Sequence, residues 1–127
     1  AHNPDNIKKI ADEGWDVDLF MTCFYYLTRK INKDDPNQIL PAGSYNFYKD
    51  DPKAMTQVIR QVKQPCLAFK ILGAGRLTST QERVKSAFQF AFENIKPIDG
   101  VIIGMFPWYF DEIGANSGYV RELGKIG

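Results

Sequence analysis

Three short apolar runs, separated by longer amphipathic segments, set the pattern of the chain. The runs cover residues 17–26 (VDLFMTCFYY), 66–72 (CLAFKIL) and 100–106 (GVIIGMF). Their apolar positions do not alternate with polar ones, which is typical of strands buried on both faces of a parallel sheet. The pattern therefore predicts three buried parallel strands.

Helical signals flank each of these runs. Apolar residues recur at spacings of three and four, and the expected starts carry a capping side chain or a proline suited to the first turn. We expect four helices, starting at Asn3-Pro4, at Asp51-Pro52, at a capping box of Ser79 and Glu82, and near residue 111. The first should end at Gly14 and the last near residue 123.

The order helix, strand, helix, strand, helix, strand, helix predicts an α/β fold with parallel strands. The loops 24–50, 72–78 and 105–111 then follow the carboxyl ends of the strands, where sheets and barrels of this kind bind ligands. Residues 30–50 are polar and are expected to form a long loop, part of which the SYNFY segment folds back. At 127 residues, taken as a single domain, the chain is short for a closed barrel of about 250 residues.

Composition and charge exclude several classes of function. A net charge of +1 is too small to favour nucleic acid or an anionic membrane, and no apolar run reaches the roughly 18 residues of a membrane span. No signal peptide is recognisable. Cys23 and Cys66 lie in apolar runs and are expected to be buried reduced thiols, which points to a cytoplasmic protein. With His2 as the single histidine and no CxxC pair, no metal site is expected.

Lys70 is the most informative charged residue, because it lies inside the second apolar run. A lysine cannot stay charged and unpaired in an apolar layer. Three interpretations remain open: an ion pair with a carboxylate of a neighbouring strand, binding of a ligand anion, or a desolvated amine that forms a Schiff base.

Two loops supply further candidates. In GAGR, Gly73 and Gly75 allow a ligand close to the backbone before a helix N-terminus, and Arg76 offers a fork for a phosphate, although such a loop can also be a simple tight turn. The aromatic residues of 106–110 either wall an adenine or substrate pocket or pack beneath a lid or between subunits.

Three segments in order along the chain resemble a known family. They are HNPDNIKKIADEGWDVDLFMTCFYYLTR at 2–29, LAFKILGAGRL at 67–77 and VIIGMFPWYFDEIGAN at 101–116. Together they are similar to the aldo/keto reductase-like superfamily of TIM-barrel oxidoreductases linked to NAD(P).

The resemblance implies the C-terminal half of a (β/α)8 barrel: a leading helix and about three parallel β/α units after the fifth strand. It implies NAD or NADP as cofactor, with Phe24 stacked on the nicotinamide, Lys70 and the 73–76 loop beside the pyrophosphate, and Asn116 at the adenine end. The family's catalytic Tyr-Lys-Asp-His tetrad lies on earlier strands. This chain would therefore be a part of an oxidoreductase, inactive by itself.

Two alternatives to the oxidoreductase remain open. One is a non-catalytic barrel relative that binds a small molecule or anion, and the other is a Schiff-base aldolase-type enzyme that uses Lys70. In every case the expected partner is a small-molecule ligand. Because three parallel strands leave two unpaired edges, the chain is also expected to self-associate or to associate with the other half of its barrel.

Overall fold

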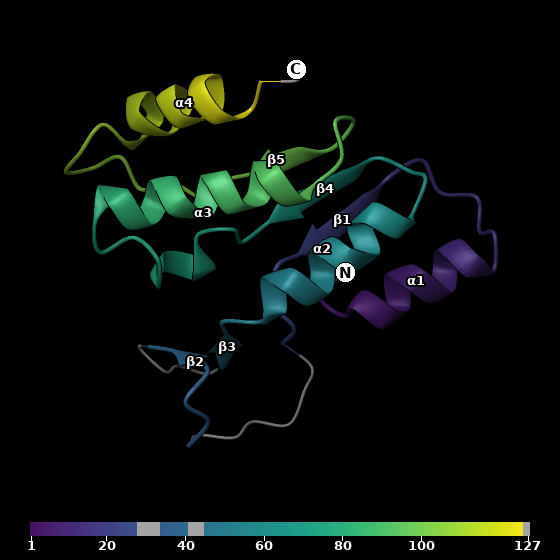
Figure 1. The fold of residues 1–127 in the computed structure, drawn as a ribbon. Coiled ribbons are helices and arrows are strands. Elements are labelled where there is room, and N and C mark those ends of the chain that lie inside the picture. Colours follow the sequence, from purple (N-terminus) through teal and green to yellow (C-terminus); the bar gives the residue numbers. More distant parts are fainter. Residues whose placement is uncertain (28–33, 41–44, 126–127) are drawn as a thin grey trace.

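The computed structural model describes residues 1–27, 34–40 and 45–125, and it confirms an α/β fold (Figure 1). Within these ranges the main elements are α1 (Pro4–Asp12), β1 (Phe20–Cys23), α2 (Asp51–Gln61), β4 (Cys66–Phe69), α3 (Gln81–Asn94), β5 (Gly100–Ile102) and α4 (Glu112–Leu123). They follow one another in the predicted order.

The three main strands form one parallel sheet in the order β1-β4-β5. Its register sets Thr22 beside Ala68 and Ala68 beside Val101. Helices α2 and α3 lie in front of the sheet in Figure 1, with α1 next to α2 and α4 next to α3. The carboxyl ends of the strands therefore meet at a common edge, as the alternating order predicts.

The hydrophobic core lies between the sheet and this helical layer. Ile7 of α1, Ile59 of α2, and Phe88 and Ala91 of α3 are fully buried there. Cys66 is buried as well, and both it and Cys23 are free thiols, as expected. Burial of these side chains is the main favourable contribution to folding.

The expectation that the strands are buried on both faces is wrong. Met21 and Ile102 are each 41% exposed, although their neighbours along the strands point into the core. Helices α2 and α3 lie on the same side of the sheet, so Met21 and Ile102, on the opposite face, are left partly open to solvent.

The strands are also shorter than predicted. The strand expected over 66–72 ends at Phe69, because Lys70 adopts a left-handed backbone conformation with φ of 60°. An extended strand cannot continue through such a residue. Lys70 is therefore not inside the strand: it is the half-buried first residue of the loop that follows.

The helix starts are confirmed, but two of the capping assignments are wrong. Asn3 caps α1 and accepts a hydrogen bond from the Asp5 N–H at 2.8 Å. Helix α3 is capped by Thr80, whose Oγ1 accepts from the Arg83 N–H, so the Ser79 capping box does not form. Asp51 is the first residue of α2 rather than its cap, and its buried carboxylate accepts from the N–H groups of Tyr26 and Tyr48 instead.

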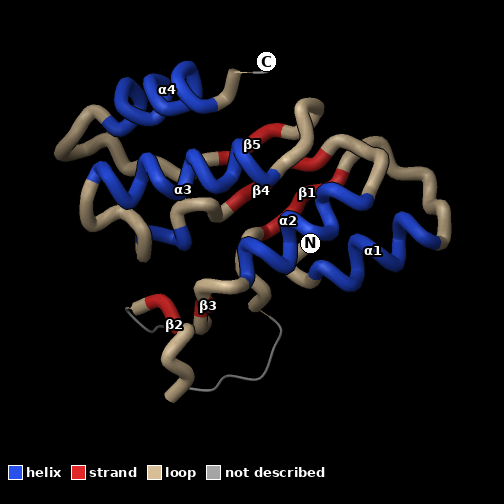
Figure 2. The backbone as a smooth tube through the Cα atoms, in the orientation of Figure 1, coloured by secondary structure: helices blue, strands red, loops and turns tan. Residues whose placement is uncertain are grey.

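A short hairpin occupies the described part of the predicted long loop. Strands β2 (Gln38–Ile39) and β3 (Phe47–Tyr48) pair antiparallel, with Ile39 opposite Phe47, and Figure 2 shows them apart from the main sheet. The rest of that prediction, at 30–33 and 41–44, lies outside the described residues. Phe47 and Tyr48 are buried, so the end of the SYNFY segment does fold back onto the core.

Ala1 extends the sheet beyond β1 by one residue. Its ammonium group donates to the Met21 carbonyl, and its own carbonyl accepts from the Cys23 N–H at 3.0 Å. These two bonds flank Thr22 and have the pattern of a parallel bridge. The outer edge of β1 is thus competent to pair with another parallel strand.

No helix in the described ranges is long and apolar enough to cross a membrane.

Candidate functional site

A cavity of about 520 Å³ opens at the carboxyl ends of β4 and β5. The loop after β4 contributes Lys70, Ala74 and Gly75 to its wall, and the loop after β5 contributes Met105 and Phe106. This volume is within the range of small-molecule sites, about 300–1,000 Å³. The parallel pairing of β4 with β5 thus brings the loop that carries Lys70 and Gly75 beside the loop after β5.

Lys70 is held at this position by its unusual backbone. Its carbonyl accepts from the Gly73 N–H at 2.8 Å, and its ammonium group lies 5.7 Å from the centroid of the Phe47 ring. No carboxylate of the described residues pairs with it, so the first of the three interpretations, an ion pair with a neighbouring strand, is not found there. The contact with Phe47 is a cation–π interaction, which leaves the N–H donors of the ammonium available.

The glycine turn forms a short 3₁₀ turn, Gly73–Gly75, in which all three residues have positive φ (62°, 50° and 86°). Glycine adopts this conformation without strain, which explains two of the three positions. Ala74 and Gly75 both line the cavity. Successive backbone N–H groups in turns of this kind form concave sites for anions.

Arg76 does not line the cavity. Its guanidinium lies 4.0 Å from the centroid of the Phe47 ring and donates to the carbonyls of Gly73 and Tyr45 at 3.3 and 3.2 Å. The predicted phosphate fork is therefore directed at the β2–β3 hairpin, where it ties the glycine turn to that element.

Two further predicted site residues lie elsewhere. Phe24 is 1% exposed and meets the ring of Phe90 edge-on at 6.2 Å, on the helical side of the sheet. Asn116 is buried in α4 and lines neither this cavity nor the one beside Phe24. The structure thus brings Lys70 and Gly75 together at this cavity, whereas Phe24, Gly73, Arg76 and Asn116 do not line it.

Sequence reasoning missed a cluster of titratable groups near Lys70. Burial, together with the positive charges of Lys70 and the N-terminus, lowers the pKa of His2, so its imidazole is neutral at pH 7. Burial likewise raises the pKa of the Cys23 thiol, which stays protonated. The His2 ring also meets Phe69 edge-on at 5.5 Å. Only the pairing of Ala1 with β1 places His2 here, and no sequence pattern indicates that pairing.

Glu112 was also missed. It is the one carboxylate among the described residues that line this cavity, and one of its oxygens accepts from the Phe106 N–H at 2.7 Å. This bond fixes the loop after β5 to the start of α4. The second carboxylate oxygen can accept from a ligand hydroxyl group.

The aromatic loop 106–110 is open to solvent. Trp108 and Tyr109 are 77% and 88% exposed, and only Phe106 of this group lines the cavity. Phe106 and Tyr109 tilt against each other with their centroids 6.3 Å apart. The expectation of an aromatic wall is therefore met by Phe106 alone.

Comparisons with family models, with curated proteins and with solved structures found no match. In the ranges that the structure describes, no group of three or more His, Cys, Asp or Glu residues could hold a metal ion.

Proposed function

We propose that the chain is the C-terminal part of an aldo/keto reductase-like (β/α)8 barrel and that it binds the phosphate side of NAD or NADP. The observation that supports this most directly is the shared cavity wall formed by Lys70 with Ala74 and Gly75 of the left-handed turn. The chain supplies the phosphate-binding part of the site, and the catalytic tetrad belongs to the other half of the barrel.

The chemistry of the cavity suits a phosphorylated nucleotide. The Lys70 ammonium has no carboxylate partner in the described part of the chain, and a phosphate accepts charge-assisted hydrogen bonds from such a group. The Ala74 N–H offers a second donor on the same wall. Glu112 would accept from a ribose hydroxyl, and Phe106 offers an apolar surface to a base.

The barrel is supported by the uncovered face of the sheet. In a (β/α)8 barrel the helices lie outside and the opposite sheet face fills the interior with side chains. Met21 and Ile102 occupy that face here and are half exposed. The parallel bridge at Ala1 supports the pairing of a further strand beside β1.

Ligand titration tests the proposed nucleotide site. We expect NADH and NADPH to quench tryptophan fluorescence, since Trp108 lies in the loop that borders the cavity. Lys70→Gln should weaken binding about tenfold through loss of the charged donor. Lys63→Gln is the matched control, because Lys63 is exposed and lines neither cavity. If Lys70→Gln bound the dinucleotides as tightly as the parent protein, the site would be wrong.

Inorganic phosphate separates the two binding hypotheses. If inorganic phosphate binds at Lys70 but neither NADH nor NADPH binds, a non-catalytic relative that binds anions is the better description of the protein. If none of these ligands binds, both are contradicted.

A Schiff-base enzyme is the second candidate, favoured by the neutral imidazole of His2 near Lys70. In that reaction the Lys70 amine would attack a carbonyl carbon and water would leave as the imine forms. Borohydride reduction with a carbonyl substrate, followed by peptide mass spectrometry, should then label Lys70. Labelling equal to that of surface lysines would exclude this mechanism.

We also propose that the exposed sheet face and the aromatic loop drive self-association or association with the other barrel half. Static light scattering should report a species larger than the monomer at micromolar concentration, and Ile102→Lys should shift it toward the monomer. A monomer in the parent protein, or an unchanged mass in Ile102→Lys, would contradict this.

A further inference from the structure

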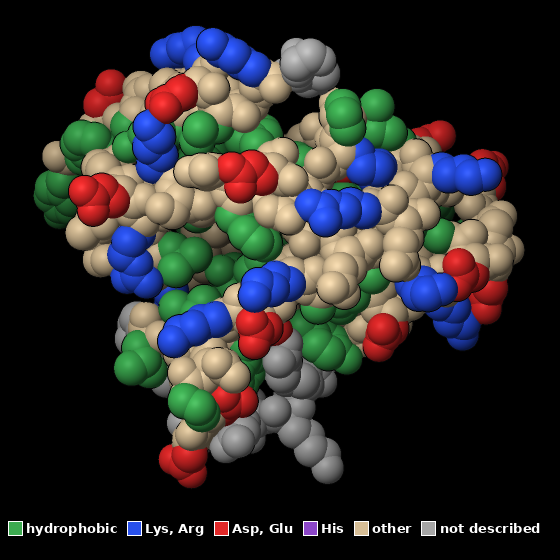
Figure 3. Space-filling view, viewed as in Figure 1, with side chains coloured by type: hydrophobic (Ala, Val, Ile, Leu, Met, Phe, Trp, Pro, Cys, Tyr) green, Lys and Arg blue, Asp and Glu red, His purple; other side chains and the backbone are tan. Residues whose placement is uncertain are grey.

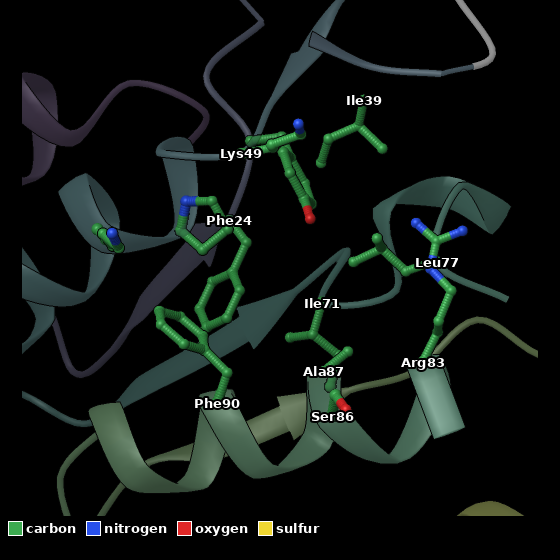
Figure 4. Close-up of a pocket in the computed structure, with 12 residues that line it drawn as sticks. Phe24, Ile39, Lys49, Ile71, Leu77, Arg83, Ser86, Ala87 and Phe90 are labelled. Atoms are coloured by element: carbon green, nitrogen blue, oxygen red, sulfur yellow. The ribbon is translucent and has the colours of Figure 1, made fainter. Parts of the chain in front are cut away.

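A second cavity lies on the helical side of the sheet, between α3 and the start of α2. It has a volume of about 360 Å³ and an apolar wall that includes Phe24, Ile71 and Phe90. Figure 4 shows Phe24 and Phe90 pointing toward each other at one end, with Lys49 and Arg83 at other parts of the rim. In Figure 3 the hydrophobic floor is visible as a hollow bordered by basic side chains.

All charged side chains lining this cavity within the described residues are basic: Lys49, Lys53 and Arg83. Lys49 forms no ion pair with a described residue. Lys53 lies 3.8 Å from Asp50, but both side chains are more than half exposed and such pairs contribute little. Arg83 donates to the neutral Ser79 hydroxyl at 2.9 Å. The rim therefore carries a local excess of positive charge.

Tyr25 adds a further aromatic ring to the apolar wall of the cavity and is 1% exposed.

We propose that this cavity binds a small organic anion, a carboxylate with an aliphatic or aromatic body. The carboxylate meets Lys49 and Arg83 at the rim, while the body packs between Phe24 and Phe90. This site is separate from the cavity at Lys70, and it does not depend on the nucleotide proposed there.

An NMR titration of the whole protein with sodium octanoate tests the proposal, and 1-octanol, an uncharged analogue of the same chain length, is the control ligand. Octanoate should shift the amide resonances of Ala87 and Phe90 and bind at least about tenfold more tightly than octanol. Shifts confined to Met105 and Phe106 would assign binding to the aromatic loop. Either that result or equal affinity for octanol and octanoate would overturn the proposal.

Two substitutions sharpen the test. Arg83→Glu should weaken octanoate binding at least about tenfold and leave octanol binding unchanged, whereas Lys63→Glu, of the same charge change but away from the cavity, should alter neither. Ala87→Trp should fill the cavity and abolish the binding of octanoate and of octanol. Circular dichroism establishes whether each variant is folded. If Arg83→Glu is unfolded, Lys49→Glu takes its place in the test. No binding of octanoate by the parent protein at millimolar concentration would also overturn the proposal.

Discussion

The guanidinium of Arg76 lies 4.0 Å from the centroid of Phe47, and the same ring stacks on Tyr25 with centroids 4.6 Å apart and an interplanar angle of 13°. The three residues come from the loop after β4, the hairpin and the segment after β1. This stack joins the hairpin to the carboxyl end of the sheet, and Lys70 approaches the same ring. It is the packing that fixes the wall of the candidate site.

We therefore expect Arg76→Lys to destabilise the protein by about 1–2 kcal/mol. Lysine keeps the charge but loses the planar stack on Phe47 and the two hydrogen bonds to the carbonyls of Gly73 and Tyr45. Urea unfolding measures the change. Arg83→Lys is the matched control, because the Arg83 side chain is exposed and, among the described residues, donates to the Ser79 hydroxyl alone, so the change should alter stability by less than about 0.5 kcal/mol. Equal effects would show that the stack contributes nothing specific.

Asp99 is expected to be the most sensitive carboxylate in the described chain. It accepts from the Cys66 N–H at 2.8 Å and the Lys96 N–H at 2.7 Å, and its Oδ1 lies 3.0 Å from the Lys96 ammonium. Since the Asp99 side chain is fully buried, Asp99→Ala leaves these donors unpaired and should cost about 3–5 kcal/mol.

The control for Asp99 is Asp50→Ala, which removes an exposed pair with Lys53 at 3.8 Å and should cost less than about 1 kcal/mol. Thermal unfolding followed by circular dichroism measures both. A loss below about 1 kcal/mol for Asp99→Ala would mean that the turn between α3 and β5 does not depend on this carboxylate.

Thr22→Val is expected to raise stability by about 1 kcal/mol. Thr22 is fully buried in β1, and its Oγ1 has no hydrogen-bond partner in the described structure. Replacing a buried hydroxyl that has no partner with a methyl group of similar shape removes a desolvation penalty. Thr56→Val is the contrasting control, because the Thr56 hydroxyl donates to the Lys53 carbonyl at 3.1 Å and its removal should be destabilising. A loss of stability in Thr22→Val would reveal an unrecognised partner.

Local signals in the sequence predict the order of elements well, because each signal acts within a few residues. Asn3 caps its own helix, and the apolar runs form strands wherever they pair. The ends of the strands could not be predicted, since the φ of Lys70 depends on the turn that follows it. Likewise, the exposure of Met21 and Ile102 depends on which face the helices cover, and that choice is not a local property.

The candidate site was predicted in part for the same reason. Lys70 and Gly75 lie close together because they belong to the same loop after β4, and the parallel pairing of β4 with β5 brings Phe106 beside them, which the order of elements already implies. The position of His2 depends on the bonds between Ala1 and β1, and that of Arg76 on the stack with Phe47, so both follow from contacts between distant segments. The cavity beside Tyr25 is lined from five separate stretches of the chain and has no signature in the sequence.

Alkaline pH should destabilise the protein through Tyr25 and the two thiols. Burial raises the pKa of Tyr25 to about 12, with the nearby Cys23 adding to the effect and Arg76 opposing it, and burial also raises the pKa of Cys23 and Cys66. The folded protein thus holds protons that the unfolded chain releases. This contribution is fully present below about pH 8.5, where the unfolded chain is still protonated, and it is lost as pH rises through about 9 to 12.

Tyr25→Phe removes the phenol and isolates its share of this effect. We expect the free energy of unfolding of the parent protein to fall by about 1 kcal/mol more than that of Tyr25→Phe between about pH 9 and pH 11, because Tyr25 titrates near 10 in the unfolded chain and near 12 in the fold. Tyr109→Phe is the control, since Tyr109 is 88% exposed and its removal should leave the pH dependence unchanged. Urea unfolding at a series of pH values measures all three proteins. If Tyr25→Phe followed the parent curve, the Tyr25 phenol would have to ionise in the folded protein as readily as in the unfolded chain, and its burial against Phe47 could not be correct.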